Sequence, residues 1–155
     1  NASGWTEGEG SWSVSNNAYQ NTNSGRTSSY AGQSDWTDIT FEADVKPTNG
    51  TDVWLIFRVQ DASNYYLYTL QTGILYKLVN GNYTQVATGS GSYSQGTTYN
   101  MKVVLEGNSI KVYNGSTEVL STTDNTYSDG YVGFGSNGAA GEFDNVVGTY
   151  GGCSV

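Results

Sequence analysis

The chain has 155 residues, which fits one domain that buries a substantial core. Fourteen acidic and six basic residues leave a net charge of -8, which repels phosphate backbones and anionic membrane surfaces, so neither nucleic acid nor a membrane is an expected partner. The 21 glycines, 13 tyrosines and single proline are typical of short strands and tight turns. The composition therefore predicts an all-β protein.

The first part of the chain predicts a hairpin followed by a loop. Apolar residues alternate weakly along Trp5–Ala18, and Asn16-Asn17 is a turn signal. Tyr30 is the only large side chain in the polar segment Gln20–Ser34, so we expect that segment to be partly loop, with Tyr30 projecting toward a ligand.

A strand is predicted at Ile39–Lys46, where apolar and charged residues alternate. One face is apolar and consists of Phe41, Ala43 and Val45, while the other carries Glu42, Asp44 and Lys46. Pro47 and the pair Asn49-Gly50 end this strand.

The most informative stretch, Val53–Leu70, predicts two strands joined by the turn Asp61–Asn64. If Leu67 points inward beside Leu55 and Phe57, the outer face collects aromatic and charged side chains. That face would carry Trp54, Arg58, Tyr66 and Tyr68, with Glu42 and Asp44 at its acidic margin.

The remaining segments continue the pattern of short strands and turns. We predict strands at Ile74–Val79, Tyr83–Ala87, Tyr99–Leu105, Ser109–Tyr113, Thr117–Leu120, Gly130–Gly135 and Gly141–Val147. No helical period and no internal repeat is present. About a dozen short strands without helices predict a sandwich or barrel.

The predicted aromatic face is a candidate binding site. Stacking surfaces with a few fixed polar groups suit a ligand that has apolar C–H faces and many hydroxyls, which describes a sugar. Arg58 would donate paired hydrogen bonds to adjacent hydroxyls while a neighbouring carboxylate holds its charge. Two alternatives stay open: the tyrosines only cover the sheet, or the site lies on the loops around Tyr30, Trp36 and Asn137.

Five segments together carry a family resemblance. They are Gly10–Gln20, Ser34–Pro47, Phe57–Leu70, Tyr99–Leu120 and Gly130–Val147. In their order they resemble the concanavalin A-like, laminin-G-like jelly roll, and in particular the family 66 carbohydrate-binding modules of secreted polysaccharide-degrading enzymes. The residues that match the family pattern are Arg58, Asp61, Asn64, Tyr65, Tyr66, Phe143, Asp144 and Asn145.

The resemblance implies an antiparallel β-sandwich and a noncatalytic module that holds a parent enzyme on a polysaccharide, fructan or another plant or microbial glycan. The alternatives are a lectin-fold glycoside hydrolase or polysaccharide lyase, and an adhesion domain like laminin G. Laminarinase-like relatives of the fold carry a Glu-x-Asp-x-(x)-Glu strand, but here Lys46 and Pro47 follow Glu42 and Asp44 where the third acid would stand. We therefore expect no catalytic residues.

Asp144 is the candidate metal ligand. Sandwiches of this class often bind a structural calcium ion (Ca2+) near the last strand, and carboxylates suit that ion. The alternative is that Asp144 caps a turn beside Asn145.

The domain is expected to span residues 1–149, with 150–155 as a tail or linker. The polar, His-free composition fits a secreted, extracellular protein, a monomer within a multidomain enzyme. The single Cys153 has no cysteine to pair with in this chain.

Overall fold

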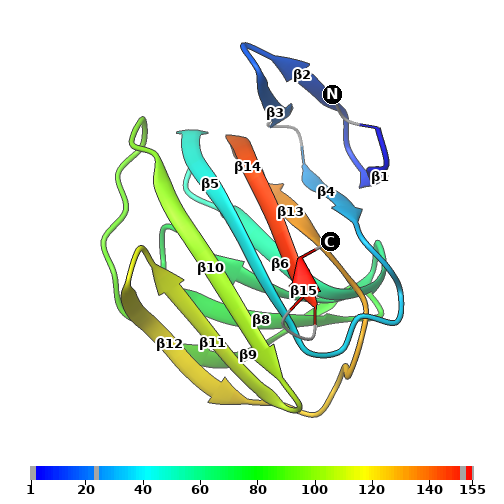
Figure 1. The fold of residues 1–155 in the computed structure, drawn as a ribbon. Helices are drawn as coiled ribbons and strands as arrows, with labels where there is room; N and C mark the ends of the chain where they lie inside the picture. The colour runs from blue at the N-terminus through cyan, green and yellow to red at the C-terminus, as the bar shows by residue number, and fades with distance from the viewer. Residues whose placement is uncertain (1–2, 23–24, 151–152, 155) are drawn as a thin grey trace.

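The computed structural model describes residues 3–22, 25–150 and 153–154 and consists of two antiparallel sheets that pack face to face (Figure 1). Sheet A contains, in spatial order, β1 (Thr6–Glu9), β4 (Arg26–Ala31), β13 (Tyr131–Asn137), β6 (Val53–Asp61), β7 (Asn64–Thr69), β8 (Ile74–Val79) and β9 (Asn82–Thr88). Sheet B contains β12 (Thr117–Thr123), β11 (Ser109–Asn114), β10 (Tyr99–Glu106), β5 (Ile39–Asn49), β14 (Ala140–Tyr150), β3 (Ala18–Asn21) and β2 (Trp12–Ser15).

The predicted all-β, concanavalin A-like sandwich is confirmed, and the described residues contain no helix. Within those residues, accordingly, no helix is long and apolar enough to cross a membrane. The predicted tail at 150–155 overlaps the end of β14, and β15 (Cys153–Ser154) pairs with that end. The side chain of Cys153 lies outside the described part of the chain.

The main core lies between the sheets and follows the period of two that strands impose. On β5 the predicted apolar residues Phe41, Ala43 and Val45 are buried, while Glu42 and Asp44 alternate with them on the outer side of sheet B. Sheet A contributes Leu55, Phe57, Val132 and Phe134, and β10 and β11 add Met101, Val103, Leu105, Ile110 and Val112.

The predicted face of Tyr66 and Tyr68 is wrong. Tyr68 lies opposite Leu55 and Tyr66 opposite Phe57, so both tyrosines point into the main core. Leu67 instead lies with Trp54 on the outer side of sheet A. Residues that oppose each other in an antiparallel pair share a face, and a one-residue difference in register exchanges the two faces completely.

A bulge at Arg58 changes the end of the same hairpin. The regular pairing of β6 with β7 stops after Phe57 and resumes only at Asp61, and Arg58 adopts a φ of 47°. Extra residues in one strand bend it and redirect their side chains. The side chain of Arg58 therefore leaves the face that carries Trp54.

Candidate functional site

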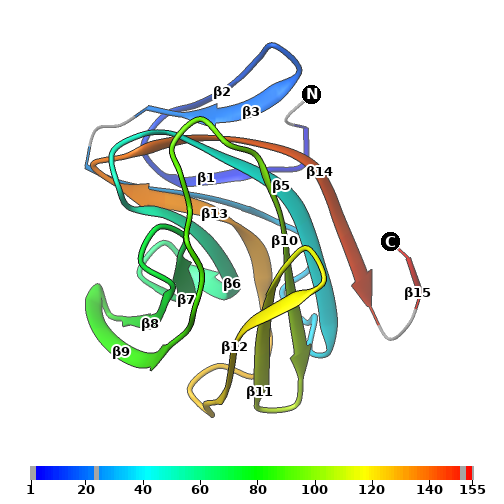
Figure 2. The same ribbon diagram turned by 90° about the vertical axis from the view of Figure 1, so that its left-hand side faces the viewer.

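The outer face of sheet A, which points away from sheet B, carries apolar side chains that are buried. The outer face of an antiparallel sheet is more commonly polar and exposed to solvent. Six residues there form a second buried cluster: Trp54, Ile56, Val59, Tyr65, Leu67 and Leu78. Tyr30, Tyr76 and Tyr131 pack against it. Figure 2 shows β7, β8 and β9 curling out of the plane of the other strands. This curl lets sheet A cover part of its own outer face.

Beside this cluster the face is hollowed. The hollow has a volume of about 450 Å³ and is lined by Thr51, Asp52, Trp54, Leu67, Thr69, Thr72, Tyr76, Tyr83 and Asn137. Aromatic and aliphatic side chains share the lining with hydroxyls, an amide and one carboxylate. A mostly apolar hollow with a few fixed polar groups has the general character of a small-ligand site.

Three aromatic rings shape the hollow. The centroid of the Tyr83 ring lies 6.1 Å from that of Trp54 and 6.4 Å from that of Tyr76, and both contacts are edge-on. Tyr83 is 43% exposed, whereas Trp54 is 1% exposed. Tyr83 therefore offers the accessible ring surface, and Trp54 supports it from beneath.

A glycine on the neighbouring strand accommodates the Trp54 indole. Gly135 lies opposite Trp54, and a Cβ atom at that position would come within 2.9 Å of the indole and 2.6 Å of the Thr27 carbonyl oxygen. Any larger residue would displace the ring or the strand. The sequence thus provides the space in which Trp54 lies against β13.

Asp52 is the polar centre of the hollow. Its Oδ1 accepts a hydrogen bond of 2.6 Å from the indole nitrogen of Trp54. Burial raises the pKa of Asp52, and the bond from Trp54 opposes that rise. A carboxylate fixed beside an aromatic ring can accept hydrogen bonds from ligand hydroxyls while the ring contacts their C–H groups.

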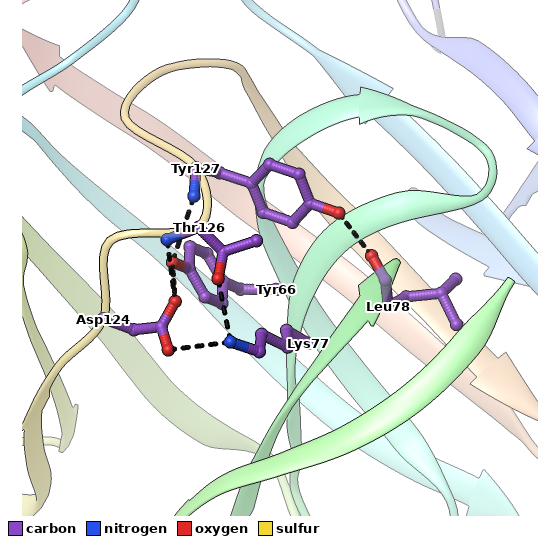
Figure 3. A network of polar contacts seen from close by, with 6 residues as sticks. All are labelled: Tyr66, Lys77, Leu78, Asp124, Thr126 and Tyr127. Carbon is purple, nitrogen blue, oxygen red and sulfur yellow. Dashed lines mark hydrogen bonds and ion pairs between the residues drawn. The ribbon is translucent and has the colours of Figure 1, made fainter. Parts of the chain in front are cut away.

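The two core tyrosines that the sequence placed in the site have structural partners instead. The Tyr68 hydroxyl lies 3.0 Å from that of Tyr93. The Tyr66 hydroxyl donates to Asp124 at 2.6 Å, and Asp124 also contacts Lys77 at 3.1 Å (Figure 3). This network fastens the segment after β12 to β7 and β8.

The charge of Asp124 is stabilised in that network. Burial alone would raise the pKa of Asp124, but hydrogen bonds from Tyr66, Thr126 and Lys77 together lower it to about 2. Burial and the neighbouring carboxylate raise the pKa of Tyr66 to about 12. Both groups keep their charge states at neutral pH, as expected of a structural contact.

Arg58 also has a structural environment. It is 1% exposed, and its guanidinium donates to the carbonyl oxygens of Thr37 at 3.0 Å and Tyr127 at 3.1 Å. Asp61, the acidic residue of the same hairpin, accepts hydrogen bonds from the backbone of Ser63 and the side chain of Asn64. Arg58 joins two loops and does not point toward Trp54.

The predicted acidic margin lies on the opposite side of the sandwich. Glu42 and Asp44 face outward from sheet B, whereas Trp54 faces outward from sheet A. Asp44 accepts hydrogen bonds from Asn100 at 3.1 Å and Asn145 at 2.8 Å. The two acids therefore cannot flank the hollow.

Tyr30 and Trp36 occupy different places. Tyr30 lies on the outer face of sheet A, where its ring packs against Tyr131 with centroids 5.2 Å apart. Trp36 packs against the main core from the loop before β5. Of the residues predicted for the aromatic face, the structure brings only Trp54 to the hollow, and of those named for the alternative site on the loops it brings Asn137 there.

Asp144 has the geometry of a turn cap. Its Oδ1 accepts a hydrogen bond of 2.8 Å from the backbone nitrogen of Asn145, which has a φ of 51°. Among the described residues, no group of three or more His, Cys, Asp and Glu side chains could hold a metal ion. Calcium takes about six to eight oxygen ligands, and the Asp144 side chain, with one oxygen bonded to Asn145, would supply only a small part of them. Calcium at Asp144 stays a prediction from the family resemblance.

Comparison with solved structures confirms the resemblance suggested by the sequence. The chain is similar to carbohydrate-binding module CBM66 from Bacillus subtilis, with a TM-score of 0.84, 26% identity and 94% of each chain covered. A Bacillus subtilis protein of unknown function with a galectin-like fold matches with a TM-score of 0.64 and 13% identity, covering 93% of this chain and 88% of that one. The second likeness concerns the fold alone.

Comparison by sequence gives one further relative. The chain is 30% identical over 121 residues to an extracellular exo-alpha-L-arabinofuranosidase from Streptomyces chartreusis. The match covers 72% of this chain but only 15% of the length of that enzyme. No family model matches the chain.

Proposed function

We propose that this chain is a noncatalytic module that holds a secreted enzyme on a glycan, and that the hollow around Asp52 and Tyr83 binds the sugar. One observation carries the proposal: a chain that resembles CBM66 over 94% of its length has an aromatic hollow with a fixed carboxylate on one outer face. Tyr83 would contact the C–H face of a sugar ring. Asp52 and Asn137 would bind its hydroxyls.

The ligand class we favour is a glycan that presents furanose sugars. The family resemblance implies fructan, and the extracellular relative is named for acting on arabinofuranosides. Fructofuranose and arabinofuranose share a five-membered ring and a hydroxymethyl group. The same relative supports secretion and attachment to an enzyme, because the similar segment is 15% of a much longer protein.

The carboxylates argue for binding without hydrolysis. Most glycosidases need two carboxyl groups that flank the scissile bond. Among the described residues that line the hollow, Asp52 is the only acidic one. On the other side of the sandwich, Asp44 is held by two amides and Lys46 lies 3.7 Å from Glu142. Asp44 and Glu142 thus have partners within the fold.

A polysaccharide panel tests the proposal. The domain is run in affinity gels that contain levan, inulin, arabinan or cellulose, and each mixture is assayed for new reducing ends. Retardation by levan, inulin or arabinan without new reducing ends is the expected result. Release of oligosaccharides would establish an enzyme, and no retardation by any furanose glycan would refute the proposed ligand class.

A further inference from the structure

Tyr65, on β7, belongs to the buried cluster on the outer face of sheet A. The residue is 0% exposed, and among the described residues its hydroxyl makes no hydrogen bond. A buried polar group that lacks a partner destabilises the folded state, and such groups are rare in native proteins. Its retention at this position requires an explanation.

The surroundings of this hydroxyl are polar and partly accessible. Burial raises the pKa of Tyr65, and the charge of Arg26 opposes that rise while Tyr83 and Glu9 add to it. The Nε of Arg26 lies 2.6 Å from Oε1 of Glu9, and these side chains are 23% and 33% exposed. A guanidinium and a carboxylate at the surface supply donors and acceptors that match neighbouring hydroxyls of a sugar.

Tyr83 lies between this polar group and the hollow. It lines the hollow, and it also interacts with Arg26. Its contacts with Trp54 and Tyr76 are edge-on, and much of its surface is exposed. The ring centroids of Trp54 and Tyr65 are 6.4 Å apart, so the two residues form one continuous floor beneath Tyr83.

We propose that Glu9, Arg26 and Tyr65 form a second saccharide subsite beside the hollow, which opens when the Tyr83 ring turns aside. A hydroxyl of the second sugar unit bonds to the Tyr65 hydroxyl, and Arg26 and Glu9 bind its neighbours. The inference rests on the proposed function, because the hollow would hold the first sugar unit. The ligand is thus at least a disaccharide of neutral furanose units.

The test is Tyr65→Phe, which removes only the hydroxyl. Calorimetric titrations use two monosaccharides locked as furanoses, methyl β-D-fructofuranoside and methyl α-L-arabinofuranoside, and two trisaccharides, a levan-derived trisaccharide and arabinotriose. For the trisaccharide that the parent binds, affinity should fall by about three- to tenfold, the effect of one hydrogen bond, while affinity for the monosaccharide stays the same. The variant should melt at or above the temperature of the parent, because a group without a partner has been removed.

Tyr113→Phe is the matched control. Tyr113 lies on β11 in sheet B, where Lys102 contacts its ring, and this change should leave both affinities unchanged. Equal trisaccharide affinity for Tyr65→Phe and the parent would overturn the second subsite while leaving the proposed function intact. A lower melting temperature would also overturn it, because the hydroxyl would then have a structural partner such as buried water. If the parent binds none of the four sugars, the proposed function itself fails, and the subsite with it.

Discussion

The indole nitrogen of Trp54 donates a 2.6 Å hydrogen bond to the Asp52 carboxylate, and this bond joins the second buried cluster to the hollow. The indole is almost entirely buried, whereas the carboxylate lines the hollow. Trp54 therefore acts by orienting Asp52 and supporting Tyr83. Trp54→Ala would remove a buried ring at a cost of about 3 to 5 kcal/mol, so Asp52 is the better residue for a binding test.

Asp52→Asn should weaken glycan binding about tenfold, the order expected for one hydrogen bond to a charged group. Asparagine keeps the size of the side chain and can still accept from the Trp54 indole. The melting temperature should stay within a few degrees of that of the parent. Calorimetric titration with the glycan found in the gel panel measures the affinity. An unchanged affinity would show that Asp52 does not bind the glycan.

The pH dependence of binding follows from the same carboxylate. Burial raises the pKa of Asp52 above its usual value of about 3.9, so the group takes up a proton earlier on acidification than an exposed aspartate does. A protonated Asp52 is a weaker acceptor. Affinity should therefore be full at pH 7 and fall as the pH is lowered toward 4, and the same titration of Asp52→Asn should be flat. A parent affinity that does not change between pH 7 and 4 would contradict this role.

Tyr66→Phe should lower stability and leave glycan affinity unchanged. Loss of the hydroxyl removes the donor to Asp124 and the acceptor for the Tyr127 backbone nitrogen. The free energy of unfolding should fall by about 1 to 3 kcal/mol. Because the pKa of Asp124 is lowered to about 2, the network stabilises the fold fully above about pH 4, and this contribution is lost as the pH falls toward 2. Urea unfolding at pH 7 and pH 2.5 measures both effects. If the variant were as stable as the parent but no longer bound the glycan, Tyr66 would be shown to belong to the binding site.

Arg58→Ala should destabilise the domain by about 2 to 5 kcal/mol, because it deletes a buried side chain and two hydrogen bonds to loop carbonyls. Lys111→Ala, which changes a half-buried cation on β11, is the control and should have little effect. Under conditions where the variant is folded, it should bind the glycan as the parent does. A stable variant that no longer binds would show that Arg58 contacts the ligand.

Chelation should leave the melting temperature unchanged. A metal that binds only the folded state raises the midpoint of unfolding by mass action, and Asp144 instead bonds to the backbone of Asn145. Thermal melts with EDTA and with added calcium make the comparison. A fall in the melting temperature with EDTA that calcium reverses would establish the calcium site predicted from the family resemblance.

The sequence predicted the fold because nearly every strand has its own alternation and turn residues. Glu42 and Asp44 alternate with Phe41, Ala43 and Val45 in the structure as they do in the sequence. The register of the central hairpin was also available: a turn of two or four residues at Asp61–Asn64 puts the even-numbered residues of β7 opposite Phe57, and Tyr66 and Tyr68 are even-numbered. The turn therefore carries the information that places both tyrosines in the core.

The site was harder to predict because it depends on the curl of sheet A. Tyr83 lies between two polar residues on β9, and Tyr76 lies between Leu75 and Lys77 on β8, so the sequence marks each only as a member of a strand face. No feature of the sequence around Tyr83 indicates that its side chain lies near Arg26, because the two residues are more than fifty positions apart. The bulge that redirects Arg58 is likewise set by tertiary packing. Trp54 is predictable from the sequence, because its place on a strand face follows from the alternation of β6 alone.

Two-dimensional NMR of the 15N-labelled domain tests the location of the site most directly. The four tryptophans give four indole N–H signals, and only that of Trp54 belongs to the hollow. On titration with a levan or arabinan oligosaccharide that the parent binds, the Trp54 indole signal should shift, together with the backbone signals of Asp52, Tyr83 and Asn137. An unmoved Trp54 signal, with shifts on the outer face of sheet B around Glu42 and Asp44, would contradict the proposed site.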